Sequence, residues 1–210
     1  MFSPFETILW DFDGVILDSM SIRDEGFRRV LNPYPDDQVE QLIDYHRING
    51  GLSRYVKFRF FFEEIRGEGI TEDDVHKLAD QFSVYMLNTL KDPGLLIEDT
   101  MAFIQANHSR FNMHIVSGSD QDELRELCRS LQIDQFFDSI HGSPALKTDL
   151  VRQIMAMHKY NSERLVLVGD SVNDYDAAKA NGLTFFGYNN DEIKGLGEGY
   201  IPAFKSLTSV

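Results

Sequence analysis

The sequence contains a single cysteine, so no disulfide can form within the chain. Cys128 lies in a helical pattern with Leu124, Leu127 and Leu131, where a cysteine is more often a small core residue than a nucleophile. No apolar run approaches the roughly 18 residues of a membrane span, and the first residues lack the basic region of a signal peptide. We therefore expect a cytoplasmic protein with no membrane partner.

Basic residues are scarce relative to acidic ones: 20 Lys and Arg compare with 34 Asp and Glu, and the net charge is −14. This charge repels a nucleic-acid backbone and an anionic membrane face, so neither is an expected partner. Hydrophobic residues make up 42% of the 210 residues, enough for the core of one large domain or of a domain with an insert. Nothing in the sequence indicates the oligomeric state.

The most informative segment is residues 7–14, Thr-Ile-Leu-Trp-Asp-Phe-Asp-Gly. Its apolar part is typical of a buried strand, so Asp11 lies at the carboxyl edge of a sheet, where open α/β sheets bind ligands. The period of two places Asp11 and Asp13 on the same side. Two such carboxylates repel each other, and Mg²⁺ would relieve the repulsion and attract a phosphate. Taken alone, the pair is explained more simply as a polar turn after a core strand.

Residues 17–90 have helical periodicity and no strand pattern. We expect four helices there, the first capped by Asp18 or Ser19. A turn sequence, Asp-Pro-Gly, follows at residues 92–94. The pattern predicts an inserted all-helical domain over residues 17–90, with a core domain formed by residues 1–16 and 91–210.

After residue 96, short apolar runs alternate with helical segments, which is typical of a parallel sheet with crossover helices. The expected strands are at 112–116, 138–141, 165–168 and 183–186. The helix before the third of these is expected to begin at Thr148 or Asp149, and the tail from Asp191 is loop-rich and gives no further prediction. The predicted fold class is α/β: a Rossmann-like, doubly wound parallel sheet core with an inserted all-helical domain.

Polar side chains follow the strands of this predicted sheet. Ser117 follows the strand at 112–116, and Asp170 and Asp174 follow the strand at 165–168. Lys147 lies at the beginning of a helix between them. A cation, a hydroxyl and carboxylates could together bind Mg²⁺ and a transferring phosphoryl group. Each residue alone has an ordinary explanation, as a turn residue, a surface lysine or an acid in the first turn of a helix.

Together these residues resemble the motifs of a phosphatase of the haloacid dehalogenase (HAD) superfamily, in their usual order. The four motifs are Asp11-Phe-Asp13-Gly-Val, Ser117, Lys147 and Gly-Asp170-Ser-Val-Asn-Asp174. The helical insert is similar to the small cap domain of phosphoglycolate-phosphatase-like and β-phosphoglucomutase-like members. The resemblance implies Mg²⁺-dependent hydrolysis of a small phosphorylated metabolite. The family often carries a proline after the lysine, where this chain has Thr148.

A carboxylate nucleophile divides phosphoryl transfer into two easier steps through an aspartyl-phosphate, and Asp11, nearest the strand end, is best fixed for attack. Asp13 would act as acid toward the leaving alcohol and as base toward water. The resemblance assigns Mg²⁺ to Asp11, the backbone carbonyl of Asp13, and Asp170. It gives Asp174 a supporting role, holding a metal-bound water or Lys147.

Two alternatives remain open at this point. A β-phosphoglucomutase-like mutase typically carries a His on the first cap helix, where this chain has Arg23. A phospho-accepting receiver domain of signalling proteins also groups acids, a Ser or Thr, and a Lys around Mg²⁺. Receivers, however, lack a helical insert after the first strand and normally take the phosphate on an Asp from a middle strand. An Asp at position 13 favours phosphate esters over the dehalogenase and phosphonate branches of the superfamily.

The predicted cap has a basic stretch between Asp44 and Glu63, which contains no acid but four basic residues, Arg47, Arg54, Lys57 and Arg59. Arg54 lies in the first turn of a predicted helix, where a cation opposes the helix dipole. We expect Arg54, with Lys57, to reach the closed site and bind an acidic or phosphorylated part of the substrate. The alternative is a solvated face whose cations pair with acids elsewhere in the cap.

Overall fold

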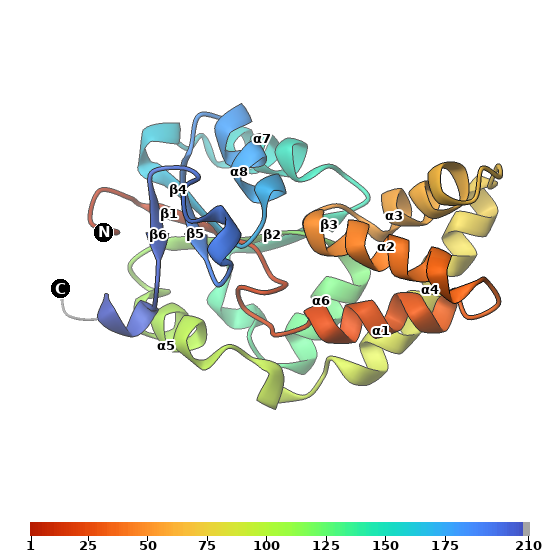
Figure 1. Ribbon diagram of the computed structural model, residues 1–210. Coiled ribbons are helices and arrows are strands. Elements are labelled where there is room, and N and C mark those ends of the chain that lie inside the picture. Colours follow the sequence, from red (N-terminus) through yellow and green to blue (C-terminus); the bar gives the residue numbers. More distant parts are fainter. Residues whose placement is uncertain (208–210) are drawn as a thin grey trace.

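The structure is a computed structural model that describes residues 1–207. These form a β-sheet flanked by helices, with a helical bundle beside it (Figure 1). Six strands in this part of the chain form one sheet, in the order β3-β2-β1-β4-β5-β6 with every neighbouring pair parallel. The strands are β1 (Thr7–Trp10), β2 (Asn112–Asp120), β3 (Ser139–Ser143), β4 (Leu165–Gly169), β5 (Thr184–Tyr188) and β6 (Gly199–Ile201). The predicted Rossmann-like α/β fold is confirmed.

Helices cover both faces of the sheet, which is why β1 is buried along its whole length. On one face lie α7 (Lys147–His158) and α8 (Val172–Ala180), and on the other lie α5 (Glu98–Asn107) and α6 (Gln121–Ser130) (Figure 1). Successive residues of β1 alternate between these layers: Leu9 packs with the α7 and α8 side, whereas Ile8 and Trp10 pack with the other.

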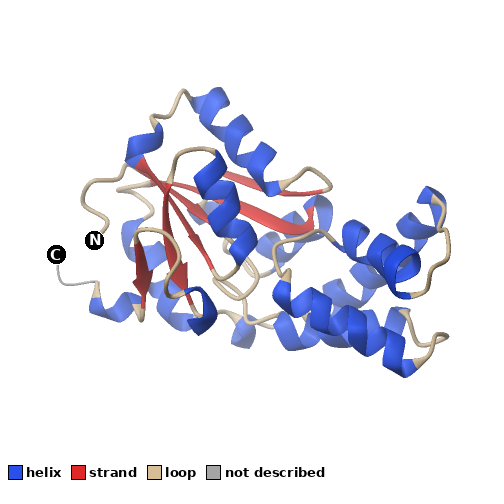
Figure 2. Ribbon diagram, turned by 45° about the horizontal axis from the view of Figure 1, so that its top comes forward, coloured by secondary structure: helices blue, strands red, loops and turns tan. Residues whose placement is uncertain are grey.

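The bundle follows β1 in the chain and lies at one end of the sheet (Figure 2). It contains α1 (Met20–Val30), α2 (Asp36–Ile48), α3 (Arg54–Phe60), which runs on into a π-helical turn (Phe61–Ile65), and α4 (Glu72–Thr89). Aromatic side chains fill its interior, with the rings of Phe27 and Phe82 at a centroid distance of 4.6 Å. No helix within residues 1–207 has both the length and the apolar character needed to cross a membrane.

Two helices of the bundle, α3 and α4, begin with a side-chain cap. The Ser53 hydroxyl accepts a hydrogen bond from the Val56 N–H, and the Thr71 hydroxyl accepts one from the Asp74 N–H. Such caps satisfy N–H groups that the first turn of a helix leaves free.

Other local predictions are wrong. The helix α7 begins at Lys147, before Thr148 and Asp149, and it has no side-chain cap. Neither Asp18 nor Ser19 caps α1 through its side chain, because the Ser19 hydroxyl is used elsewhere, as described below. The strand β2 runs on to Asp120, so Ser117 lies within it. The loop-rich tail also contains an element that was not predicted, β6, a three-residue edge strand beside β5.

Candidate active site

The ends of β1 and β4 bring the first and last predicted motifs together. Trp10 is paired with Val168 in the sheet, and the backbone N–H of Asp11 donates to the Val168 carbonyl at 2.9 Å. Asp11 and Asp170, each one residue beyond its strand, therefore emerge at the same edge. This is the carboxyl edge that the sequence pattern predicted.

Three carboxylates gather at this edge. Asp11, Asp170 and Asp174 each offer an oxygen, and these atoms lie within 4.8 Å of one another. The Lys147 Nζ, at the first residue of α7, lies 2.8 Å from Asp11 Oδ1 and also pairs with Asp174. The second oxygen of Asp174 accepts hydrogen bonds from the Ser171 N–H at 3.0 Å and from its hydroxyl at 2.6 Å. Asp174 is thus held in place by Lys147 and Ser171.

The cluster carries more negative charge than one lysine balances. Burial and the neighbouring Asp174 raise the pKa of Asp11 to about 7, and burial and Asp11 raise that of Asp170. Although burial alone would lower the pKa of Lys147, Asp11 and Asp174 raise it above its ordinary value, so the lysine stays charged. Closely spaced carboxylate oxygens with uncompensated charge fit a hard dication such as Mg²⁺.

The loops that carry the carboxylates are braced by Gly14, the last residue of the segment 7–14, and by two asparagines that the sequence did not predict. Gly14 has φ +75°, and a Cβ there would overlap a carboxylate oxygen of Asp170, so glycine is required on both counts. The side-chain amides of Asn189 and Asn190 donate to the carbonyls of Gly14 and Asp170, each at 2.8 Å. The only local signal was an Asn-Asn pair directly after β5.

Asp13 lies apart from this cluster and accepts three hydrogen bonds. Its donors are the Ser19 hydroxyl at 2.5 Å, the Arg23 Nε at 2.6 Å and the Ser119 hydroxyl at 2.6 Å. Burial opposes ionisation, but Arg23 and the two hydroxyls hold the pKa of Asp13 below its ordinary value. Ser117 is buried two residues earlier on β2, where its hydroxyl oxygen accepts from the Ser119 N–H at 3.0 Å. Ser19, Arg23 and Ser119 were not predicted as site residues.

A small cavity of about 20 Å³ lies beside Asp13, and its lining includes the two predicted cap residues, Arg54 and Lys57. The Arg54 Nη1 is 2.6 Å from both Glu123 Oε2 and the Ser83 hydroxyl. The Lys57 Nζ is 2.9 Å from His46 Nδ1 and donates to the Gly50 carbonyl at 3.1 Å. Arg54 is therefore not the free cation that the sequence suggested.

The other two basic residues of the stretch pair with acids of the bundle, which is the alternative that the sequence left open. Arg47 pairs with Asp24 and Asp44, and Arg59 pairs with Glu72, all within the bundle. The pair between Arg59 and Glu72 is exposed and contributes little to stability, whereas Asp24 is largely buried. Only Arg54 and Lys57, of the four, line the cavity beside Asp13.

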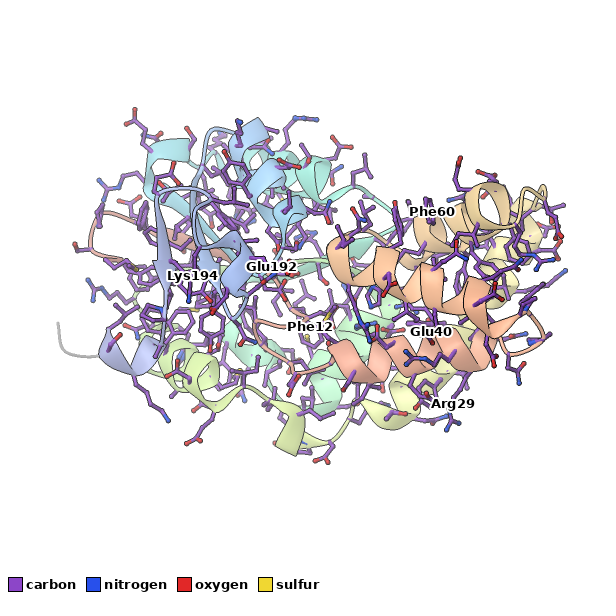
Figure 3. The ribbon with its side chains drawn as sticks, viewed as in Figure 1. Phe12, Arg29, Glu40, Phe60, Glu192 and Lys194 are labelled. Carbon is purple, nitrogen blue, oxygen red and sulfur yellow. The ribbon has the colours of Figure 1, made fainter. Side chains whose placement is uncertain are left out.

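The bundle touches the sheet directly at this site. A Cβ on Gly118, after Ser117 on β2, would overlap the Gly51 carbonyl oxygen of the bundle, so the two backbones are in close contact. A second cavity of about 120 Å³ lies at the same junction, lined by residues that include Gly51, Gly118, Lys147 and Asn173. In Figure 3, Phe12 lies at this junction, whereas Arg29 and Glu40 lie on the outer part of the bundle.

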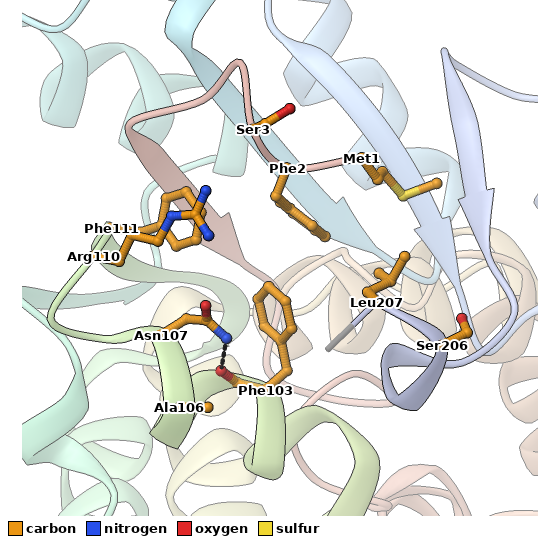
Figure 4. Close-up of a pocket in the computed structure, with 10 residues that line it drawn as sticks. All are labelled: Met1, Phe2, Ser3, Phe103, Ala106, Asn107, Arg110, Phe111, Ser206 and Leu207. Carbon is orange, nitrogen blue, oxygen red and sulfur yellow. Dashed lines mark hydrogen bonds between the residues drawn. The ribbon is translucent and has the colours of Figure 1, made fainter. Parts of the chain in front are cut away.

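Another cavity, of about 300 Å³, lies away from these residues and next to both ends of the described chain (Figure 4). Its lining includes Phe2, Phe103 and Leu207, together with the Asn107 side chain, whose amide donates to the Phe103 carbonyl at 2.8 Å. None of the predicted site residues lines it. It has no part in the site described above.

The fold and the carboxylate cluster define a class of protein, namely a parallel α/β enzyme with an acidic site at the carboxyl edge of its sheet. A model of the haloacid dehalogenase-like hydrolase family matches residues 8–188. The chain belongs to this family, as its motifs implied. Receiver domains lack a helical insert after the first strand, whereas here α1 to α4 follow β1. The receiver alternative is therefore set aside.

Curated relatives are distant but extend over most of the chain. A phosphorylated carbohydrates phosphatase of Thermotoga maritima is 23% identical over 184 residues, with 85% of this chain and 82% of the relative covered. A phosphoglycolate phosphatase of Colwellia psychrerythraea is 24% identical, with 89% and 87% covered. The tyrosine-protein kinase PtkA of Mycobacterium tuberculosis is 25% identical, with 86% of this chain and 62% of the kinase covered.

Solved structures share the fold at lower identity. A β-phosphoglucomutase from Clostridium difficile has a TM-score of 0.78 at 16% identity, and the match covers 97% of this chain and 93% of the mutase. CbbY from Rhodobacter sphaeroides, solved in complex with phosphate, has a TM-score of 0.74 at 16% identity, with 97% and 96% covered. At these identities the likeness is one of fold.

Proposed function

We propose that the protein is a Mg²⁺-dependent phosphatase that hydrolyses a small phosphomonoester through an aspartyl-phosphate on Asp11. The observation that carries the proposal is the cluster at the sheet edge, where the Lys147 Nζ lies 2.8 Å from Asp11 Oδ1 beside Asp170 and Asp174. Family membership and the names of two distant relatives, both phosphatases, support the same chemistry.

The donor set fits Mg²⁺. Asp11, the backbone carbonyl of Asp13, and Asp170 would hold the ion, since its preferred ligands are oxygens and the cluster has uncompensated negative charge. Both oxygens of Asp174 already accept hydrogen bonds, which supports an orienting role for this residue. When bound, Mg²⁺ would supply charge stabilisation for the transferring phosphoryl group.

In the first half-reaction, a carboxylate oxygen of Asp11 forms a bond to phosphorus while the bond from phosphorus to the alcohol oxygen breaks. The Lys147 ammonium and the Ser117 hydroxyl stabilise the charge on the phosphoryl oxygens. Asp13 gives a proton to the departing alcohol. In the second half-reaction, Asp13 removes a proton from the water that attacks phosphorus, and Asp11 is regenerated as a free carboxylate.

The ion pair between Arg23 and Asp13 bears differently on these two tasks. By holding the Asp13 pKa low, it favours the ionised carboxylate that acts as base in the second half-reaction. Protonation of the alcohol in the first half-reaction requires that this pair loosen. We therefore expect the contact between Arg23 and Asp13 to loosen when the alcohol group of the substrate binds at Asp13, while Arg23 stays paired with Glu123.

We propose further that the helical bundle, residues 17–90, acts as a cap over the core formed by residues 1–16 and 91–210. The contact between Gly51 and Gly118 would exclude water from the site while the cap is closed. The cavity at Asp13 is about the size of one water molecule, so a substrate enters only when the cap opens.

The test is an assay of p-nitrophenyl phosphate and a panel of phosphate esters, with and without Mg²⁺. We expect release of inorganic phosphate that depends on Mg²⁺ and on Asp11. β-Glucose 1-phosphate serves as the mutase substrate in the same panel. Conversion to glucose 6-phosphate without phosphate release would favour the mutase alternative over hydrolysis.

A further inference from the structure

Glu123 is a buried acid that joins the sheet half of the molecule to the bundle. Its side chain is 0% exposed, and it projects from the first turn of α6. Its Oε2 accepts from Arg54 Nη1 at 2.6 Å, and its Oε1 accepts from Arg23 Nη1 at 3.3 Å. Both arginines belong to the bundle and line the cavity beside Asp13.

These contacts balance the charge around the cavity. Arg23 lies between two carboxylates, Asp13 and Glu123, and Arg54 pairs with Glu123. Two guanidinium groups therefore face two carboxylates in a buried place, where an additional charge is costly unless it is paired. A second anion on the substrate would find both arginines already neutralised and would be repelled by Glu123.

Lys57 is the remaining basic residue on the described lining of this cavity, apart from His46. Burial and the nearby Arg23 lower the pKa of Lys57 to about 7, and burial together with Lys57 lowers that of His46. The Lys57 Nζ is moreover already engaged, by His46 Nδ1 at 2.9 Å and by the Gly50 carbonyl at 3.1 Å. The cavity is thus poorly suited to a second phosphate.

The same cavity offers hydrogen-bond donors without partners. Within residues 1–207, the Nη2 atoms of Arg23 and Arg54 are buried and have no hydrogen-bond partner. A buried donor left unpaired is costly, so an oxygen of the ligand is the natural acceptor. An uncharged hydroxyl oxygen accepts such bonds and adds no charge to a balanced site.

We propose that Glu123 determines specificity by making this cavity select a leaving group that bears hydroxyls over one that bears a carboxylate or a second phosphate. This inference rests on the proposed phosphatase function. It replaces the expectation that Arg54 binds an acidic part of the substrate, because the protein itself supplies the acid that Arg54 binds. The substrate class is then the monophosphate of a neutral sugar or polyol.

The experiment uses two substrates of matched size, 2-hydroxyethyl phosphate and 2-phosphoglycolate, which differ in a terminal hydroxyl or carboxylate. The wild-type protein should have the higher kcat/KM for 2-hydroxyethyl phosphate. In Glu123→Gln the ratio of the two kcat/KM values should shift toward phosphoglycolate by about 10-fold or more, because a repelling charge is removed. Glu123→Asp, which keeps the charge, should retain the wild-type preference.

Glu126→Gln is the matched control, since Glu126 lies on the same helix with its side chain 41% exposed and paired with Lys91. Its ratio should equal that of the wild type. A wild-type preference for phosphoglycolate, or an equal ratio in wild type and Glu123→Gln, overturns the inference. If Glu123→Gln does not fold, Glu123→Met replaces it. p-Nitrophenyl phosphate separates the two proposals, because its hydrolysis with an unchanged ratio contradicts only the role of Glu123.

Discussion

The Lys147 Nζ lies 2.8 Å from Asp11 Oδ1, and the same ammonium also binds Asp174, which Ser171 holds from its other side. The lysine is therefore shared between the proposed nucleophile and an acid that does not itself react. This arrangement fixes the lysine at the point where phosphoryl charge would develop. It also explains why Lys147 belongs to the site, although a lysine at the start of a helix is not distinctive in the sequence.

Asp11→Asn should abolish turnover of an aryl phosphate, by about 10³-fold or more, because an amide cannot form the aspartyl-phosphate. The fold should persist, since the substitution conserves shape and removes one of three crowded carboxylates. Circular dichroism and phosphate release measure the two effects. Substantial residual turnover in the folded variant would contradict the assignment of Asp11 as nucleophile.

Asp170→Ala and Lys147→Ala should have different effects on Mg²⁺ binding. Asp170 would supply a ligand oxygen, so its loss should weaken Mg²⁺ affinity at least about 10-fold. Loss of the Lys147 cation should leave the affinity equal or tighter while slowing phosphoryl transfer. Isothermal titration with Mg²⁺ alone measures the affinities without any turnover. Indistinguishable titrations for the two variants would sink this division of roles.

Asp13→Asn should be more harmful for a poor leaving group than for a good one, since a good leaving group needs little protonation. In single-turnover transfer, the loss for an alkyl phosphate should exceed the loss for an aryl phosphate by about 10-fold or more. Rapid-quench measurement of the transfer step is required, because slow hydrolysis of the aspartyl-phosphate hides the contrast in the steady state. Equal losses would count against an acid role for Asp13.

Much of the fold was predictable because strong patterns are local. The apolar runs of β1 and β4 are buried on both faces and lie between helices, so their sequence and their position agree. Asp11 and Asp170 follow from the same logic, because each lies one residue beyond a strand, whereas Ser117 lies within β2 and Lys147 begins α7. The three residues of β6 have no such pattern, and pairing with β5 at the sheet edge makes them a strand.

The partners of Asp13 and Arg54 could not be predicted in this way. Arg23 and Glu123 are 100 residues apart in the chain, and neither is part of a recognisable motif. The signal for Ser19 was misleading, because a serine before a helix normally reads as a cap. These side chains meet only because the bundle rests on the sheet, a packing that local periodicity does not encode.

Stability should fall as the pH decreases from about 6.5 to 4, in part because of His114. Burial lowers the pKa of His114 to about 4, although Asp138 opposes the shift and His158 and His141 add to it. The unfolded chain therefore binds more protons in this range, and the stabilisation present above pH 6.5 is lost on acidification. One such group contributes at most about 1.4 kcal/mol per pH unit.

Urea denaturation at pH 7, 6 and 5 measures this slope. His114→Gln should flatten the dependence of the unfolding free energy on pH, whatever its effect on absolute stability. It should not abolish the dependence, because burial also lowers the pKa of His46 and His141. His108→Gln is the control, since His108 is exposed at the end of α5. An unchanged slope in His114→Gln would show that His114 is not responsible.

Gly118→Ala should hold the bundle away from the sheet. A Cβ at this position would overlap the Gly51 carbonyl oxygen, and a backbone atom cannot yield as a flexible side chain can. Gly51 lies on the bundle and Gly118 on the sheet, the two parts that the proposed cap motion brings together. The clash should therefore oppose closure of the cap more than it disturbs the packing inside either part. Turnover should therefore decrease by about 10-fold or more while the melting temperature changes little.

Small-angle scattering with Mg²⁺ and a phosphate analogue tests the structural cause of this loss, since Gly118→Ala should keep a larger radius of gyration than the wild type. Gly195→Ala is the matched control, because a Cβ there meets nothing within 4 Å. It should leave both turnover and scattering unchanged. If Gly118→Ala retains full turnover and the compact form, the contact between Gly51 and Gly118 does not limit closure. The bundle would then sit over the site without acting as a closing cap.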